Sequence, residues 1–217
     1  MWEEDSDKGW RENEQKLPQI SDIDSASQRA STLTRQLLVL SQKQRSDARV
    51  IYPSVLLAEL APILQRALGE DTRLETRLNS QWCIKDDPAN FEQIILNLSV
   101  NSRHAMPNGG NLLIQTDDVD LGPMDPLVCG SQPGLYIPKQ LEEGAYVRIS
   151  VADTGSGIES QVLDRIFEPF FTTKLRGEGT GLGLSVVYGV VTQNGGGISV
   201  SSEAGKGSSF HVYMPKI

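Results

Sequence analysis

Two glycine-rich turns in the C-terminal half of the chain flank a segment rich in aromatic residues. The turns are Asp153–Gly157 (DTGSG) and Gly179–Gly183 (GTGLG), and Ile166–Lys174 (IFEPFFTTK) lies between them. Glycine has no Cβ and tolerates positive φ, so a backbone that carries it can approach a ligand closely. One glycine pair is common in surface turns. Two in this arrangement indicate a site at which the backbone approaches a phosphorylated ligand.

Residues 91–106 add a stripe of amide side chains upstream. Apolar residues recur here at three- and four-residue steps, as on one buried helix face: Phe91, Ile94, Ile95 and Leu98. Asn97, Asn101 and His104 share another face of the same helix. An asparagine carbonyl oxygen is a neutral, hard ligand that suits Mg²⁺. The alternative is that both asparagines cap or bridge buried backbone.

Together these segments resemble the catalytic ATP-binding domain of sensor histidine kinases, in the superfamily shared with DNA gyrase, the heat-shock ATPase chaperones and the mismatch-repair ATPases. The motifs stand in the family's order, which is an N box at 91–106, Asp-x-Gly-x-Gly at 153–157, an F box at 166–174, Gly-x-Gly-x-Gly at 179–183 and Gly-Lys-Gly at 205–207. The resemblance covers residues 53–215.

The resemblance implies ATP and Mg²⁺ as cofactors. Asp153 would accept a hydrogen bond from the adenine amino group, and Gly157 would let the backbone pass beside the base. Because an ionised carboxylate only accepts hydrogen bonds, ATP is expected over GTP. Asn101 would bind Mg²⁺, and Asn97 would occupy the neighbouring polar position. Lys174 would lie near the terminal phosphate, unless it is an ordinary solvated loop lysine.

The turn at 179–183 would present backbone N–H groups, and the helix that begins near Leu184 would present its N-terminus to the phosphates. Further nucleotide contacts implied by the resemblance are His104, Ala105, Gly155, Ile158, Phe167, Thr173, Gly179, Thr180, Gly181, Leu182, Gly183 and Ser208. His104 departs from the family's common residues. It could face the phosphates with a charge that depends on pH near neutrality, or it could be incidental.

The N-terminal part divides into two segments. Residues 1–20 are polar and acidic, which is typical of partial disorder. Residues 21–48 carry an amphipathic pattern and resemble the second helix of the dimerisation hairpin of histidine kinases. Such a helix needs a neighbour or a second chain, so a homodimer through residues 21–48 is one expectation. The family's phosphoacceptor histidine is missing, since the two histidines are His104 and His211. The histidine must then come from a longer parent kinase or from another chain.

The predicted fold is an α+β two-layer sandwich of the Bergerat type, over residues 53–217. It has a mixed, mainly antiparallel sheet with about three helices on one face, besides the N-terminal amphipathic helix. Helices are expected at 55–68, at the N box and at 184–193. Strands are expected at 73–78, 81–84, 111–116, 146–152, 198–202 and 208–214, and residues 117–143 are expected to form a long insertion of low periodicity.

Composition limits the partners. The net charge of −8 argues against nucleic acid, because phosphate neutralisation needs clustered Lys and Arg. Cys83 and Cys129 form no pair with metal-ligand spacing, so neither zinc nor a disulfide framework is expected. The sequence has neither a signal peptide nor a long apolar run, so we expect a cytoplasmic fragment without direct membrane contact, whose parent could be membrane-anchored.

The function predicted from these features is ATP-dependent phosphoryl transfer to a histidine outside this chain, in two-component signalling with a response-regulator receiver domain. The first alternative is an ATP-binding module without kinase activity. The second is a slow ATPase, because Asn97 stands where gyrase and the chaperones use a glutamate base, and an amide cannot take a proton from water. A serine kinase of the same superfamily is disfavoured by the helix at 21–48.

Overall fold

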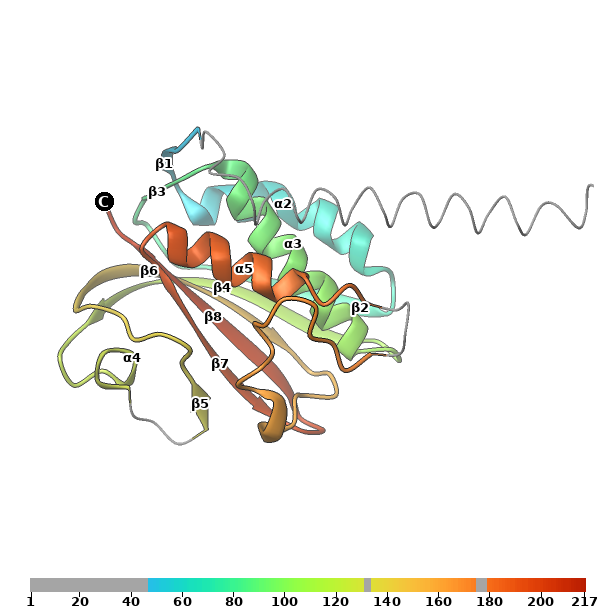
Figure 1. The fold of residues 1–217 in the computed structure, drawn as a ribbon. Helices are drawn as coiled ribbons and strands as arrows, with labels where there is room; N and C mark the ends of the chain where they lie inside the picture. The colour runs from blue at the N-terminus through green and yellow to red at the C-terminus, as the bar shows by residue number, and fades with distance from the viewer. Residues whose placement is uncertain (1–46, 131–133, 175–178) are drawn as a thin grey trace, which may run out of the picture. The chain divides into compact units, whose positions relative to one another are not determined.

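The computed structural model describes residues 47–130, 134–174 and 179–217 of the 217-residue chain. The predictions for residues 1–20 and for 21–46 of the N-terminal helix lie outside these ranges. The residues from Gln44 to Ile217 form one compact unit, whose fold is shown in Figure 1.

Three helices make one layer of the fold: α2 (Pro53–Leu68), α3 (Pro88–Ala105) and α5 (Gly183–Gln193). The start of α3 follows from its sequence, because the Asp87 side chain caps the helix by accepting from the Ala89 amide at 3.0 Å, and proline follows at the first helical position. The apolar stripe predicted for this helix is buried, with Phe91, Ile94, Ile95 and Leu98 at most 2 % exposed. Helix α3 therefore lies with one face in the core and can offer another to a ligand.

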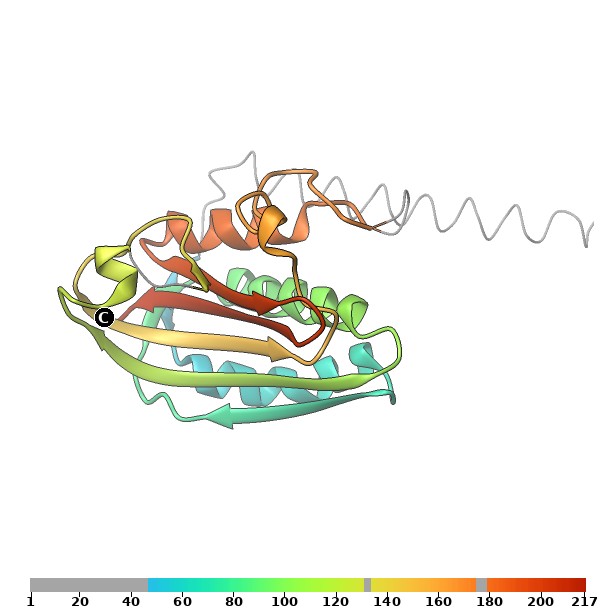
Figure 2. The ribbon, with the colours of Figure 1, turned by 90° about the horizontal axis from the view of Figure 1, so that it is seen from below.

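The second layer is a six-stranded sheet in the order β2-β4-β6-β8-β7-β5. The strands are β2 (Thr72–Leu78), β4 (Gly110–Leu121), β5 (Leu135–Tyr136), β6 (Gly144–Asp153), β7 (Gly197–Glu203) and β8 (Gly207–Pro215). Only β2 and β4 pair in parallel among the pairings of the described strands of this sheet. Figure 2 shows the three helices behind one face of the curved sheet, which confirms the predicted α+β sandwich.

Some local predictions were wrong in detail. The strand expected at 81–84 begins only at Ile84, as β3 (Ile84–Asp86), which pairs with the unpredicted β1 (Arg49–Ile51) in a separate two-stranded sheet. The insertion, residues 117–143, is more ordered than expected. Its first residues continue β4, its middle contains the short helix α4 (Pro126–Cys129), and its later part supplies β5. A single 3₁₀ turn, Ser160–Val162, follows β6.

The two faces of the sheet differ because side chains alternate along each strand. On β6, Val147 and Ile149 are at most 1 % exposed and point to the helix layer, whereas Arg148 and Ser150 lie on the face away from the helices. His211 of β8 lies on that away-facing side, as its place in the alternating pattern predicts. Its Nδ1 lies 2.8 Å from Ser150 Oγ. Burial first, and then the charge of Arg148, lower the pKa of His211.

Candidate nucleotide site

Asp153 ends β6 on the helix side of the sheet, and three donors hold its carboxylate. The amides of Gly155 and Ser208 donate to Oδ1 at 2.9 and 3.3 Å. The hydroxyl of Ser102, on α3, donates to Oδ2 at 3.1 Å. Asp153 is 8 % exposed, so its orientation is fixed in a nearly dry environment. Such a carboxylate can present its remaining lone pairs to one polar hydrogen of a ligand.

The pKa of Asp153 is raised from its usual value. Burial is the largest cause, and the hydrogen bonds from Gly155, Ser102 and Ser208 oppose it. Without those donors the carboxyl would be protonated more readily. The donors therefore keep a buried acid available as a hydrogen-bond acceptor.

The turn after Asp153 lies against the end of α3. The Ser156 amide donates to Ala105 O at 2.9 Å, and a Cβ on Gly155 would lie only 2.6 Å from the same oxygen. Gly157 has φ +69, and a Cβ there would lie 2.1 Å from Glu203 O in the β7–β8 turn. Glycine at 155 and 157 is therefore required by protein packing alone. The Ile158 amide continues the contact by donating to Ser202 Oγ at 2.8 Å.

Asn97 and Asn101 lie together opposite the start of α5. A Cβ built on Gly183 would lie 3.5 Å from Asn101 Nδ2 and 3.9 Å from Asn97 Oδ1, so this glycine leaves open the space in front of both amides. Asn97 Nδ2 is buried and makes no hydrogen bond within the described part of the chain. A buried donor without a partner is uncommon and indicates a group that a ligand satisfies. The two asparagines thus lie beside the start of α5 with one buried donor unpaired in the described residues, which favours the binding interpretation over capping.

The phosphate-side turn leads into α5 without a side-chain cap. Leu182 is the N-cap, and its apolar side chain is completely buried and makes no capping hydrogen bond. The first amides of α5 therefore stay available to an anion at the helix N-terminus. Upstream, Thr180 Oγ1 accepts from the Leu182 amide at 3.3 Å. Gly181 has φ +67, and its carbonyl accepts from the Phe170 amide at 2.9 Å.

The F box is held by aromatic packing. The ring of Phe167 is buried, lies 6.2 Å from that of Tyr136 and 5.4 Å from that of Tyr188 on α5. This arrangement supports packing, rather than direct nucleotide contact, for the Phe167 ring. Phe170 is 61 % exposed and has φ +68, a conformation uncommon for a large side chain. Arg165 lies over the ring of Phe171, at 4.6 Å from its centroid.

The remaining predicted contacts differ in their exposure. Lys174 is half-buried, and its Cδ would lie 3.1 Å from a Cβ on Gly179, so its stem folds back over the first glycine of the turn. His104 and Thr173 are exposed, and Leu184 is half-buried in the first turn of α5. The roles predicted for them stay predictions.

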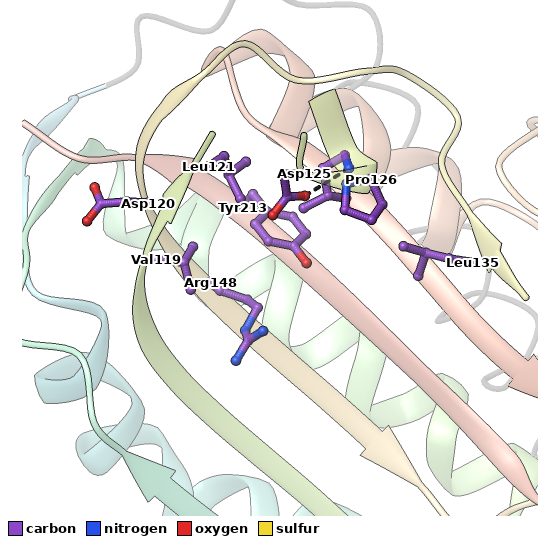
Figure 3. Close-up of a pocket in the computed structure, with 9 residues that line it drawn as sticks. Val119, Asp120, Leu121, Asp125, Pro126, Leu135, Arg148 and Tyr213 are labelled. Atoms are coloured by element: carbon purple, nitrogen blue, oxygen red, sulfur yellow. Dashed lines mark hydrogen bonds between the residues drawn. The ribbon is translucent and has the colours of Figure 1, made fainter. Parts of the chain in front are cut away.

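A separate hollow of about 410 Å³ lies on the face of the sheet away from the helices (Figure 3). Arg148 and Tyr213 reach it from β6 and β8, and Asp125, Pro126 and Leu135 reach it from the insertion. The Arg148 guanidinium is paired with Asp117 at 2.8 Å. The hollow thus marks where the insertion covers the sheet, on the face opposite the carboxylate of Asp153.

Comparison with known proteins decides the family. The model of the histidine kinase-, DNA gyrase B- and HSP90-like ATPases matches residues 86–217, which span α3 and both glycine-rich turns. The chain belongs to this ATPase family. It is 40% identical over 208 residues to the sensor kinase CckA of Brucella abortus, which is 95% of this chain but 21% of the relative. The chain thus spans about a fifth of the length of this curated relative.

Solved histidine kinases share the ATPase fold. The catalytic domain of ThkA matches with a TM-score of 0.55 and 24% identity, over 78% of this chain and 96% of that one. ThkA in complex with the response regulator TrrA gives 0.62 and 22% identity, over 91% and 50%. Full-length ShkA in complex with AMPPNP gives 0.66 and 21% identity, over 93% and 39%. The chain therefore shares its fold with the ATPase domains of these histidine kinases.

Two residues of the ATPase site were missed from the sequence. Ser102 occupies a position on the apolar stripe of α3, four residues after Leu98, and is 2 % exposed. A hydroxyl on a buried stripe signals a buried partner, so this contact could have been anticipated. Tyr136 lies in the insertion, and no local pattern connects it with Phe167.

Proposed function

We propose that the domain binds Mg-ATP between α3, the Asp153 turn and the start of α5, and transfers the γ-phosphate to a histidine outside this chain. The observation that carries the proposal is the pairing of two sites along α3. Ser102 and Asp153 form a fixed acceptor on one side of the helix, and Asn97 and Asn101 face Gly183 on another side. A base with an amino group suits the first site, and phosphates suit the second.

The residues at the second site fit a magnesium-bound triphosphate. Asn101 would offer its carbonyl oxygen to Mg²⁺, which usually takes few protein ligands and keeps water and phosphate oxygens in its other positions. The ion would neutralise phosphate charge during transfer. Asn97 Nδ2, buried and without a partner in the described residues, would donate to a phosphate oxygen or orient the incoming nucleophile. The amides at the start of α5 would bind the phosphates, with Lys174 nearby.

The adenine site would select ATP. Asp153 accepts and cannot donate while ionised, so it matches the amino group of adenine and opposes the carbonyl of guanine. Ser102 and the amides of Gly155 and Ser208 would hold the carboxylate in register with the base.

A kinase function is consistent with an amide, Asn97, at the position where related ATPases have a glutamate base. Phosphoryl transfer depends mostly on positioning and charge stabilisation, whereas hydrolysis needs a group that activates water. The amide of Asn97 cannot do so, which makes a fast ATPase unfavourable. The family relation to sensor kinases, including one solved in complex with a response regulator, supports a receiver domain as the next partner.

The domain layout is part of the proposal. Residues 53–217 would be the catalytic domain, which the compact unit Gln44–Ile217 supports. Residues 21–48 would belong to a dimerisation hairpin, and 1–20 would be a polar lead segment. Within the described ranges, the helices are too short or too polar to cross a membrane. A cytoplasmic location is proposed from the relation to sensor kinases.

The test is labelling with γ-labelled ATP and Mg²⁺, with and without a histidine-bearing dimerisation hairpin from the parent kinase. Acid-labile, base-stable label only on the added hairpin is expected. Asn101→Ala should abolish the Mg²⁺-dependent transfer, whereas Asn108→Ala, an exposed amide in the turn after α3, should leave it unchanged. Bound nucleotide without label on a matched hairpin would refute the kinase proposal and leave an ATP-binding module. Unchanged transfer by Asn101→Ala would refute its metal role.

A further inference from the structure

The insertion reaches both faces of the sheet through a strand of two residues. Strand β5 pairs with β7, with Leu135 opposite Ser201 and Tyr136 opposite Val200. Paired residues on antiparallel strands point to the same face. Val200 is fully buried on the helix side, so Tyr136 also points to that side. Leu135 points the other way, into the hydrophobic cluster and the hollow beneath the insertion.

Tyr136 makes two different contacts with the segment that leads to the phosphate-side turn. Its hydroxyl donates to Asp164 O at 3.1 Å. Its ring stacks on Phe167 at 6.2 Å between centroids and 15° between planes, and Phe167 in turn packs on Tyr188 of α5. The Tyr136 side chain therefore contacts this segment twice, at the backbone of Asp164 and at the buried ring of Phe167.

The same segment is joined directly to the glycine turn. The Phe170 amide donates to Gly181 O, and a Cβ on Gly181 would lie 2.4 Å from Phe170 C. Phe170 has φ +68, a backbone conformation that persists only when its surroundings hold it. Upstream, the segment is held by Phe167, which packs against Tyr136 and Tyr188, and by Arg165, which lies over the ring of Phe171.

We propose that Tyr136 is a positioning residue for nucleotide binding, through which the insertion holds the 164–171 segment and the glycine turn in their binding arrangement. This inference rests on the proposed function. Without the phenol, the segment would populate other arrangements, and the apparent affinity for ATP would fall in proportion to the fraction that remains competent. Access of ATP to Asp153 and the asparagines would be unchanged in the competent fraction.

Two variants of the 217-residue chain separate the contacts of Tyr136. Tyr136→Phe removes the hydrogen bond to Asp164 and keeps the stacked ring, and Tyr136→Leu removes both. We expect the Kd for Mg-ATP to rise about threefold and about tenfold, respectively. In transfer assays, KM for ATP should rise with kcat nearly unchanged.

Tyr146→Phe is the matched control. The Tyr146 hydroxyl also donates to a backbone carbonyl at 3.1 Å, that of Glu142, but its ring belongs to the cluster beneath the insertion. Loss of the Tyr146 hydroxyl should leave the affinity for ATP unchanged. An equal weakening by Tyr146→Phe would show a general loosening of the insertion and overturn the proposal for Tyr136.

Amide exchange without nucleotide tests the positioning separately. The Phe170 amide, bonded to Gly181, should exchange faster in Tyr136→Leu, while the amides of β6 and β8 keep the wild-type rate. If the wild-type chain bound no ATP, the proposed function would fail, and this exchange would still test the contact. Wild-type affinity in Tyr136→Leu, or an unchanged Phe170 amide, would overturn the inference.

Discussion

Replacement of Asp153 by asparagine should weaken ATP binding and, at the same time, stabilise the domain without ligand. The change preserves the shape of the side chain. Oδ1 can still accept from the Gly155 and Ser208 amides, and the new amide nitrogen can donate to Ser102 Oγ, which lies 3.1 Å from the present Oδ2. The fold therefore keeps its hydrogen bonds, and only the charge and the acceptor offered to a ligand are lost.

The loss of affinity follows from the hydrogen bond to the base. A hydrogen bond to a charged group contributes about 1.5–3 kcal/mol, which corresponds to roughly ten- to 150-fold in Kd. The asparagine amide would also meet the adenine amino group donor to donor. Guanine offers a carbonyl at this position, which the new amide can donate to. The affinity for ATP should therefore fall while that for GTP does not, and the ratio of the two affinities should shrink.

The gain in stability depends on pH. Burial raises the pKa of Asp153, so the folded domain binds a proton on this carboxyl more tightly than the unfolded chain does. The stability that this proton contributes is fully present below the unfolded pKa and is lost as pH rises through the folded pKa. Asparagine cannot ionise, so the variant does not lose stability as pH rises. The variant should therefore be more stable than wild type at neutral pH, with a higher Tm, and lose this advantage in acid.

Calorimetric titration with Mg-ATP and Mg-GTP, with thermal unfolding at neutral and acidic pH, measures both effects. Asp120→Asn, which neutralises an exposed carboxyl on β4, is the matched control and should change neither. Binding of ATP within about threefold of wild type would refute the role of Asp153 as the adenine acceptor. A lower Tm at neutral pH would refute the electrostatic argument while leaving the binding role open to the titration.

Two further substitutions test other parts of the molecule. Gly183→Ala places its methyl group 3.5 Å from Asn101 Nδ2, an ordinary contact, so the free energy of unfolding should not fall. The methyl group would nevertheless lie against both asparagine amides, which the proposed function assigns to Mg²⁺ and the phosphates, and titration should show at least about tenfold weaker Mg-ATP binding. Asp86, completely buried before α3, has a pKa raised mainly by burial. Asp86→Asn should raise Tm at neutral pH, lose that gain in acid and leave ATP affinity unchanged.

The parts of the fold that were predicted correctly carry local signals. Helix α3 has a cap, a proline and an apolar stripe within its own sequence, and the strands from β6 to β8 alternate over seven or more residues. Strands β1 and β5 have three and two residues, too few to show a period. They exist because distant segments pair with them, as β7 does with β5 across more than sixty residues of chain. Such pairing leaves no trace in the local pattern.

In the site, too, the features with a local sequence signal were predicted, and the contacts from distant segments were not. The ordered motifs predicted which segments meet, and the placement of Asn97 and Asn101 on one helical face indicated what they could offer a ligand. The support for each motif came from outside it. Ser102 orients Asp153 from a neighbouring stripe of α3, and Tyr136 holds the F box from the insertion. The place of Ser102 on the buried stripe signals that its hydroxyl has a partner, but which partner it meets, and that Tyr136 meets the F box, depends on how α3 and β5 lie against the turns.

The glycines themselves are weaker evidence for a ligand than the sequence suggests. A Cβ at Gly155, Gly157 or Gly181 would lie within 2.6 Å of another protein backbone atom, so each is required even if no nucleotide ever binds. Gly183 differs, because a Cβ there would meet only side-chain amides at 3.5 Å or more. A phosphate site is therefore supported by the placement of Gly183 against Asn97 and Asn101 and by the buried Asn97 Nδ2, which has no hydrogen-bond partner in the described residues. A domain that kept the other glycines but crowded these two amides would fold and fail to bind.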